Sequence, residues 1–179
     1  TCNNHRAISQ ANAAWEKLHA TGIGATACAQ HRCFYLHCVV DFQKGERQLN
    51  MDYSLANVLG YNMEGIKQVV CFYDINCSYM ANLWKHVGRS ELNDILSSLQ
   101  IIPGISIWHV HGHKKECYAQ YALLFIWGAR WVEGEIIEML WSVLNVASTS
   151  ACGMTSPHCQ ELLDFQMNDS NFMKMIQIG

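Results

Sequence analysis

The chain has 179 residues, of which 50% are apolar and 15% are charged, and two are proline. This composition excludes a disordered or low-complexity protein and is enough for one domain with a substantial core. Twelve Lys and Arg against fifteen Asp and Glu leave a formal net charge of −3, so the basic surface of a self-sufficient nucleic-acid binder is missing.

The hydrophobic pattern of the first half of the chain alternates between helix and strand. Helical spacing of apolar residues predicts a helix over residues 7–18, and small residues predict a short strand over 25–29. A second helix is predicted over residues 51–59. The apolar run at residues 69–73 predicts a buried strand, and a helix over residues 75–87 follows it directly.

The second half continues this alternation. A helix is predicted over residues 90–99 and a strand over residues 101–110. A His-rich turn comes next, and an apolar segment at residues 118–127 follows it. Past residue 148 the pattern weakens to two short amphipathic helices, at residues 161–167 and 172–178. No repeat or linker interrupts the chain, so we expect a single α/β unit.

Nine cysteines and nine histidines are the unusual part of the composition. An odd cysteine count, with no apolar signal segment, favours reduced thiols in a nuclear or cytoplasmic protein that is not secreted. The uncharged stretch at residues 117–129 is shorter than the roughly 18 residues that a membrane span needs. We therefore expect metal binding or plain burial of the thiols, and no contact with a membrane.

Asp74 stands where the predicted strand at residues 69–73 meets the next helix. Side chains at the carboxyl ends of strands in open α/β sheets commonly line the ligand crevice, so Asp74 is a candidate catalytic or metal-binding acid. The plainer alternative is that its carboxylate caps the helix that follows.

Glu133, Glu135 and Glu138 form an acidic cluster around Gly134. On a helix, Glu135 and Glu138 share a face because they are three residues apart. Two such carboxylates can hold a hard cation such as Mg²⁺ or Mn²⁺. The alternative is a first helical turn rich in acids because the helix dipole favours them.

The His-rich segment at residues 108–117 is compatible with two metal geometries. If the strand continues through it, His109, His111 and His113 point the same way and can form a three-His zinc site. That arrangement is typical of hydrolytic zinc enzymes.

If instead a helix begins near Gly112, His113 and Cys117 lie on one helical face. They then need partners from elsewhere, and Cys28 and His31 are candidates because of their C-x2-H spacing. Hydrogen-bonded histidines and ordinary buried thiols are the alternative to both metal geometries.

Glycine-rich phosphate loops and the G-x-S-x-G elbow are missing from the sequence. The charged turn at residues 43–47 contains one Lys and one Arg, which do not make a phosphate cradle. Nucleotide hydrolysis and serine esterase chemistry are therefore disfavoured.

Several motifs stand in one order between residues 2 and 150. They are C-A-Q-H at 28–31, D-F-Q-K-G-E-R at 41–47, N-M-D-Y at 50–53, Y-D-I-N-C at 73–77, N-L-W at 82–84, H-x3-H-x3-C at 109–117 and Gly134-Glu135 with Glu138 and Trp141. This ordered set resembles the fungal Kyakuja-Dileera-Zisupton transposases. An ordered set is much more specific than any single motif.

The resemblance implies an RNase H-like fold, a mixed sheet flanked by helices, in which acids hold two divalent cations, Mg²⁺ or Mn²⁺. Such a cation pair activates a water or a 3′-hydroxyl for in-line attack on a phosphodiester. Asp74 matches the second acid, and Glu138 or Glu135 the third. The first acid of the family lies on an earlier strand, upstream of the family position that corresponds to Thr1.

Val132-Glu133 replaces the family's Thr-Asp, and Met139 replaces the Arg after its last Glu. The first acid has no match in this sequence. Together with the two replacements, this predicts an inactive or domesticated DNA cleavage and strand-transfer core, incomplete at its N-terminus. That core covers residues 1–150, and residues 151–179 form a degenerate helical tail. The implied partner is transposon-end DNA, bound weakly by this chain alone, and self-association is left open.

The competing prediction is a structural zinc-binding or protein-interaction domain without catalysis. In that case Cys28, His31, His113 and Cys117 hold the fold together around one zinc ion. His109 completes the H-x3-H-x3-C block and is a further candidate ligand.

Overall fold

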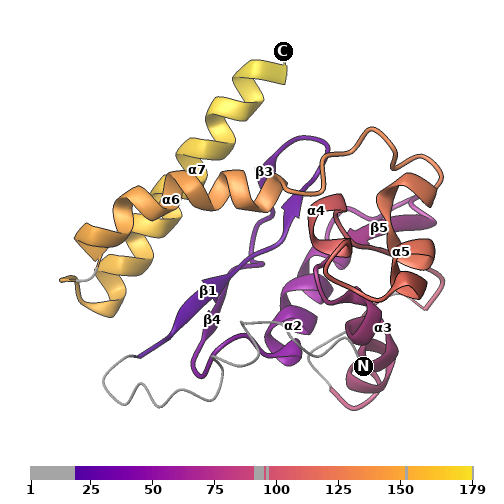
Figure 1. Ribbon diagram of the computed structural model, residues 1–179. Helices are drawn as coiled ribbons and strands as arrows, with labels where there is room; N and C mark the ends of the chain where they lie inside the picture. The colour runs from indigo at the N-terminus through magenta and orange to yellow at the C-terminus, as the bar shows by residue number, and fades with distance from the viewer. Residues whose placement is uncertain (1–18, 91–94, 96, 152, 179) are drawn as a thin grey trace. The chain divides into compact units, whose positions relative to one another are not determined.

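The computed structural model contains both short strands and helices, and it describes residues 19–90, 95, 97–151 and 153–178 (Figure 1). This mixture confirms the predicted α/β class. Within the described residues, we find no helix that combines the length and the apolar composition of a membrane span.

The chain divides into two compact units. The first unit comprises residues 1–26 and 36–134, and the second comprises residues 27–35 and 135–179. A boundary at residue 150, which the sequence predicts, is not tested by this division and stays a prediction.

Two strand pairs belong to the first unit. Strand β1 (Gly22–Gly24) pairs antiparallel with β4 (Val40–Phe42). Strand β5 (Gln68–Phe72) pairs parallel with β6 (Gln100–Gly104) along the whole length of both strands. Because the second pair is parallel, its two carboxyl ends meet at one edge.

Helices α2 (Gln48–Leu59) and α3 (Asn76–Val87) are the long helices of the first unit. Three short helical segments follow β6 in the chain. They are α4 (Ile107–Val110), α5 (Lys115–Tyr121) and the 3-10 helix η1 (Leu123–Phe125).

The main core of the first unit lies between α2, α3 and the strands β5 and β6. Ile75, Tyr79 and Leu83 repeat every four residues, so they form one buried stripe along α3. Leu55 and Leu59 of α2 pack into the same cluster. The core therefore follows from helical periodicity that is visible in the sequence.

The second unit contains a small hairpin and two helices. Strands β2 (Ala27–Cys28) and β3 (Cys33–Phe34) pair antiparallel, and the helices are α6 (Ile136–Ala151) and α7 (Ser156–Ile178). The side chain of Asn171 accepts a hydrogen bond from Phe34 N–H at 2.8 Å and donates one to Phe34 O at 2.9 Å. This pair of hydrogen bonds attaches α7 to β3.

Three predicted elements are confirmed. Helix α2 covers the predicted helix at residues 51–59 and begins earlier, at Gln48. Strand β5 and helix α3 match the predictions at residues 69–73 and 75–87 to within one residue at each end.

The predicted strand at residues 101–110 is wrong beyond Gly104. Strand β6 ends there because its pairing with β5 ends, and Ile105 instead forms an isolated parallel bridge with Ala122. The chain then forms helix α4. This correction changes how the His-rich segment is arranged.

Other predictions differ in extent. The strand predicted at residues 25–29 is reduced to β2, and α7 is one continuous helix where two short ones were predicted. The apolar segment at 118–127 divides between α5 and η1. The helix at residues 7–18 lies outside the described residues, as do residues 91–94 and 96 of the helix at residues 90–99, whose described positions are not helical.

The described strands form three separate two-stranded sheets. The single mixed sheet expected from the resemblance is not formed by these residues. An RNase H-like arrangement therefore stays a prediction.

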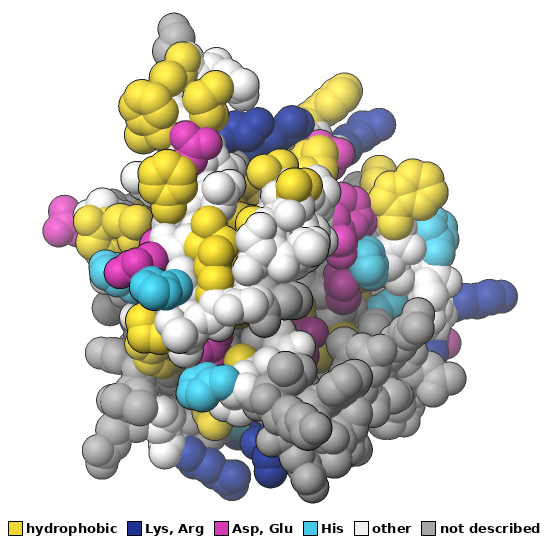
Figure 2. Space-filling model, turned by 90° about the vertical axis from the view of Figure 1, so that its left-hand side faces the viewer, with side chains coloured by type: hydrophobic (Ala, Val, Ile, Leu, Met, Phe, Trp, Pro, Cys, Tyr) yellow, Lys and Arg dark blue, Asp and Glu magenta, His cyan; other side chains and the backbone are white. Residues whose placement is uncertain are grey.

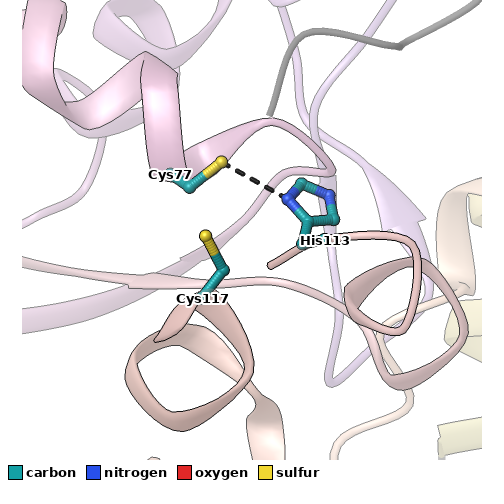
Figure 3. A group of neighbouring side chains, drawn as sticks. All are labelled: Cys77, His113 and Cys117. Carbon is teal, nitrogen blue, oxygen red and sulfur yellow. Dashed lines mark hydrogen bonds between the residues drawn. The ribbon is translucent and has the colours of Figure 1, made fainter. Parts of the chain in front are cut away.

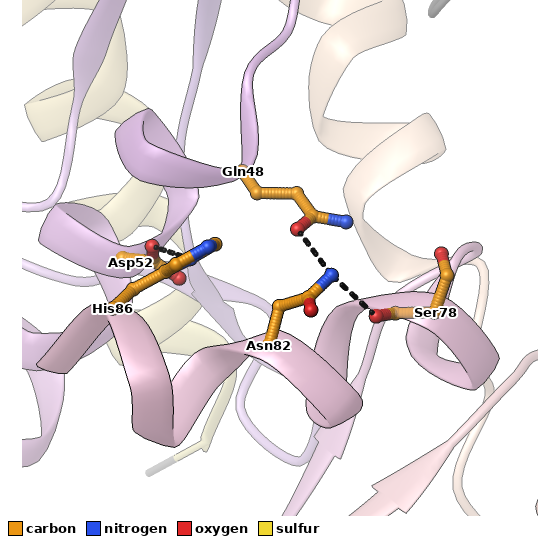
Figure 4. Close-up of polar contacts among 5 residues, drawn as sticks. All are labelled: Gln48, Asp52, Ser78, Asn82 and His86. Atoms are coloured by element: carbon orange, nitrogen blue, oxygen red, sulfur yellow. Dashed lines mark hydrogen bonds and ion pairs between the residues drawn. The ribbon is translucent and has the colours of Figure 1, made fainter.

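A pair of polar side chains, of which the aspartate is buried, links α2 to α3 (Figure 4). Nδ1 of His86 lies 2.7 Å from Oδ2 of Asp52, whose side chain is fully buried. One turn earlier on α3, the Asn82 amide donates to Oε1 of Gln48 at 3.2 Å. Burial, and secondly the charge of Asp52, raise the pKa of the Tyr79 phenol.

Replacing His86 by Leu should destabilise the fold by about 3 kcal/mol, because it leaves the Asp52 carboxylate buried without its partner. Urea unfolding followed by circular dichroism measures the change. The double substitution Asp52→Asn with His86→Leu should recover part of this loss.

His109→Ala is the matched control, since His109 also pairs with an aspartate but at a more exposed place. We expect it to cost less than about 1 kcal/mol. Equal losses of unfolding free energy from both histidine substitutions would contradict the prediction that burial of Asp52 makes the His86 contact more important.

Candidate functional site

Asp74 lies at the carboxyl edge of the parallel strands, as its position in the sequence predicts. Tyr73 N–H donates to Gly104 O at 3.2 Å, so the pairing of β5 with β6 continues to the residue before Asp74. Ile75 occupies the position that caps α3. Asp74 directly precedes this position.

The side chain of Asn76 fixes the first turn of α3 on this edge. Its amide donates to Cys71 O at 2.7 Å and to Gly104 O at 2.8 Å. These carbonyls belong to the two parallel strands, and Asn76 itself is fully buried. The position of Asp74, two residues earlier, is thus set by the sheet.

Asp74 contacts His109 of α4. Oδ2 of Asp74 lies 3.1 Å from Nδ1 of His109, and the two side chains are 45% and 35% exposed. This exposure leaves the carboxylate within reach of a hydrated cation or a polar substrate. The sequence predicted His109 as a zinc ligand, whereas the structure places it beside the candidate acid.

A second polar group lies next to this pair along the chain (Figure 3). Cys77 is in the first turn of α3, Cys117 is in α5, and His113 is in the turn before α5, with the three side chains directed toward one another. Their ligand atoms all lie within 4.8 Å of one another, and Sγ of Cys77 is 3.3 Å from Nδ1 of His113.

The donor set and the spacing of this group fit zinc. Two thiolates and an imidazole are ordinary zinc ligands, and Zn–S bonds of ~2.3 Å put tetrahedral sulfur ligands about 3.8 Å apart. All three residues are half-buried. Only small side-chain movements are needed to close such a site around an ion.

Aromatic and apolar side chains border the Cys77–His113–Cys117 group. Burial, and secondly the charges of Cys77 and Cys117, raise the pKa of the Tyr121 phenol, which therefore lies close to both thiols. Cys77 and Tyr121 also pack against a buried cluster that includes Ile105. Partial shielding from water strengthens the binding of a metal by thiolates.

The structure favours the helical alternative for the His-rich segment over the strand, although α5 begins at Lys115 and His113 lies in the turn before it. Because α4 is a helix, the continuous strand that a three-His zinc site requires is absent, and that prediction is wrong. His111 is exposed, with its ring 5.3 Å from the ring of Tyr118. His113 and Cys117 come together as predicted, with Cys77 as their partner.

Cys28 and His31 form a pair of their own in the second unit, with Sγ 3.2 Å from Nδ1. Sharing of one zinc ion between this pair and His113 with Cys117 stays a prediction. Sequence reasoning missed Cys77 as a ligand. Its signal was the cysteine that closes the Y-D-I-N-C motif, one helical turn after Asp74.

A sequence model of the Kyakuja-Dileera-Zisupton transposases matches residues 1–171. The chain belongs to this family. No curated protein and no solved structure matches the chain significantly. The family predicted from the ordered motifs is therefore confirmed.

Motifs that the chain shares with this transposase family make contacts that hold the first unit together. Glu46 of the D-F-Q-K-G-E-R motif accepts a hydrogen bond from the hydroxyl of Tyr73, which opens Y-D-I-N-C. Asp52 of N-M-D-Y pairs with His86. These contacts hold α2 and the end of β5 in place around Asp74.

The acids that resemble the family's third position begin the second unit. Glu135 O accepts hydrogen bonds from the N–H groups of Glu138 and Met139 at 3.2 and 3.4 Å, so Glu135 starts α6 and Glu138 lies in its first turn. Asp74 belongs to the first unit. A shared cation between Asp74 and either glutamate therefore stays a prediction.

The thiol of Cys71 differs from those of Cys77 and Cys117. Burial raises the pKa of Cys71 to about 11, although a hydrogen bond with Asn76 lowers it in part. Cys71 packs against the main core. It is therefore a core thiol rather than a metal ligand.

Because the pKa of Cys71 is raised to about 11, its thiol stays protonated at pH 8, where a thiolate is the reactive form. We expect Cys71 in the folded protein to react with iodoacetamide at least ~100-fold more slowly than in the urea-unfolded chain. Peptide mass spectrometry of timed samples measures the rates. Equal rates in both states would show that this thiol is accessible.

Proposed function

We propose that the chain is a DNA cleavage and strand-transfer core of the transposase type, in which Asp74 is a metal-binding carboxylate. The observation that carries the proposal is the place of Asp74, partly exposed at the carboxyl edge of two parallel strands and beside His109. Family membership supplies the class of substrate, which is DNA. A nuclear location follows from that substrate.

The arrangement we propose is RNase H-like, with Asp74 as the second acid and Glu135 or Glu138 as the third. Mg²⁺ or Mn²⁺ ions held by such acids activate the attacking oxygen and stabilise the leaving oxygen of a phosphodiester. Carboxylates are the ligands that these cations prefer. In this proposal, His109 holds the Asp74 carboxylate by its contact with Oδ2.

Binding of DNA by the 179-residue chain should be weak. Lys and Arg side chains are scattered among acidic and apolar ones on the face shown in Figure 2. The formal net charge is −3, and affinity for the phosphate backbone comes largely from counterions that Lys and Arg release. The proposed core thus depends on additional contacts for tight binding.

Asp74→Asn should weaken Mn²⁺ binding by ~tenfold or more, because loss of even an outer-sphere partner commonly has an effect of that size. Electron paramagnetic resonance of free Mn²⁺ during titration measures the affinity. Either Glu135→Gln or Glu138→Gln should have a similar effect. Asp164→Asn is the matched control, since Asp164 is an exposed acid on α7.

A wild-type affinity that Asp74→Asn leaves unchanged would contradict the proposal. The same proteins should be tested for nicking of supercoiled plasmid with Mg²⁺ or Mn²⁺. The resemblance matches none of these 179 residues to the family's first acid, so we expect no nicking by this polypeptide. Nicking that Asp74→Ala abolishes would show that another acid, such as Asp41, completes the set and that the core is active.

A second candidate function is structural zinc binding, and the Cys77–His113–Cys117 group favours it. We propose that these residues bind one zinc ion, which joins the first turn of α3 to the start of α5. Such a site scarcely exists in the unfolded chain, so zinc binding adds to the stability of the fold. The two functions are compatible within one protein.

Purified protein should contain one zinc ion per chain, measured by atomic absorption. Cys77→Ser and Cys117→Ser should each remove most of it, because a site of three protein ligands cannot hold zinc tightly with two. Cys159→Ser is the matched control, since Cys159 lies on α7 outside the group.

Cys28→Ser tests whether the Cys28–His31 pair shares this ion. Loss of zinc on that substitution would confirm the four-ligand site predicted from the sequence, and retention would assign the ion to the Cys77 group alone. Full zinc content in the Cys77 and Cys117 variants would contradict the proposed site.

A further inference from the structure

The candidate acid and the candidate zinc group are built from the same two segments of the chain. Asp74 and Cys77 lie three residues apart where β5 passes into α3, and His109 and His113 lie four residues apart in α4 and the turn after it. Contacts that join these segments include Asp74 to His109 at 3.1 Å and Cys77 to His113 at 3.3 Å.

The segment that carries Asp74 and Cys77 is firmly held. Asn76, between them in the chain, is fully buried and donates to carbonyls of both parallel strands. Its N–H also donates to Tyr73 O at 3.0 Å. Both Asp74 and Cys77 therefore have a fixed backbone position relative to the sheet.

The segment that carries His109 and His113 is anchored by the buried side chain of Val110, and its other residues are half-buried or exposed. Helix α4 has four residues, fewer than a helix needs to be stable on its own. Val110 is its buried side chain, and His111 and Gly112 after it are exposed. The position of His109 next to Asp74 thus depends on a short, mostly exposed segment.

We infer that zinc bound by Cys77, His113 and Cys117 fixes His109 beside Asp74 and so increases the affinity of Asp74 for Mn²⁺ or Mg²⁺. Coordination replaces the single Cys77–His113 hydrogen bond by two metal–ligand bonds, which attach the turn after α4 to the rigid start of α3. His109 is then a positioning residue that orients the carboxylate, as partners of metal ligands commonly do. The inference rests on the proposed function of Asp74.

Coupling between two binding sites is reciprocal in free energy. If zinc tightens Mn²⁺ binding by a given factor, Mn²⁺ tightens zinc binding by the same factor, typically between about 5-fold and 150-fold. Because the Asp74–His109 contact transmits the coupling, removing His109 should also weaken zinc binding in the absence of Mn²⁺.

The test compares the Mn²⁺ affinity of zinc-loaded and zinc-free wild-type protein by electron paramagnetic resonance. We expect at least ~fivefold tighter Mn²⁺ binding in the zinc-loaded protein. His109→Ala should keep its zinc but bind Mn²⁺ as weakly as the zinc-free protein does. His111→Ala, an exposed histidine of the same turn, should behave as wild type.

A second readout avoids zinc-free protein, which could unfold. Competition with a chromophoric chelator measures the zinc affinity of wild type, His109→Ala and His111→Ala, and we expect a loss in His109→Ala alone. Equal zinc affinities, or equal Mn²⁺ affinities of wild type and His109→Ala, would overturn the inference. Mn²⁺ binding that is insensitive to Asp74→Asn would instead overturn the proposed function, and the zinc readout would still decide the coupling.

Discussion

The candidate site depends on the hydrogen bonds that the buried side chain of Asn76 donates. A parallel strand pair ends with backbone carbonyls that need donors, and the Asn76 amide supplies them to Cys71 and Gly104. This satisfies both strands and starts α3 at a fixed point. Asp74 on one side and Cys77 on the other are placed by the same two hydrogen bonds, so an acid for hard cations and a thiol for zinc lie within one turn of chain.

The elements around this point could be predicted from the sequence because their signals are local. The apolar run of β5 and the four-residue spacing of Ile75, Tyr79 and Leu83 need no knowledge of the rest of the fold. The end of β6 could not be predicted in this way. Its length is set by its partner β5, and the apolar residues that follow Gly104 fit a strand or a helix equally well.

The same difference between local and long-range signals applies to the candidate site. The positions of Asp74, His113 and Cys117 were predicted from motif and spacing, and the helical alternative correctly paired the last two. Cys77 was missed because its contact with His113 joins segments 36 residues apart, which no local pattern reports. The contact of His109 with Asp74 was missed for the same reason, since a strand through residues 101–110 would have directed that side chain elsewhere.

The two proposed metal sites lie close together, which raises the question of how each would keep its own ion. The donor atoms separate them, because thiolates and imidazole select zinc whereas carboxylates suit Mg²⁺ and Mn²⁺. Mn²⁺ stands at the weak end of the affinity order for nitrogen and sulfur donors and does not displace zinc from Cys77 and Cys117. In the proposed arrangement, a resident zinc ion therefore maintains the geometry of the strand end, while the cation proposed at Asp74 exchanges with solvent as DNA binds and leaves.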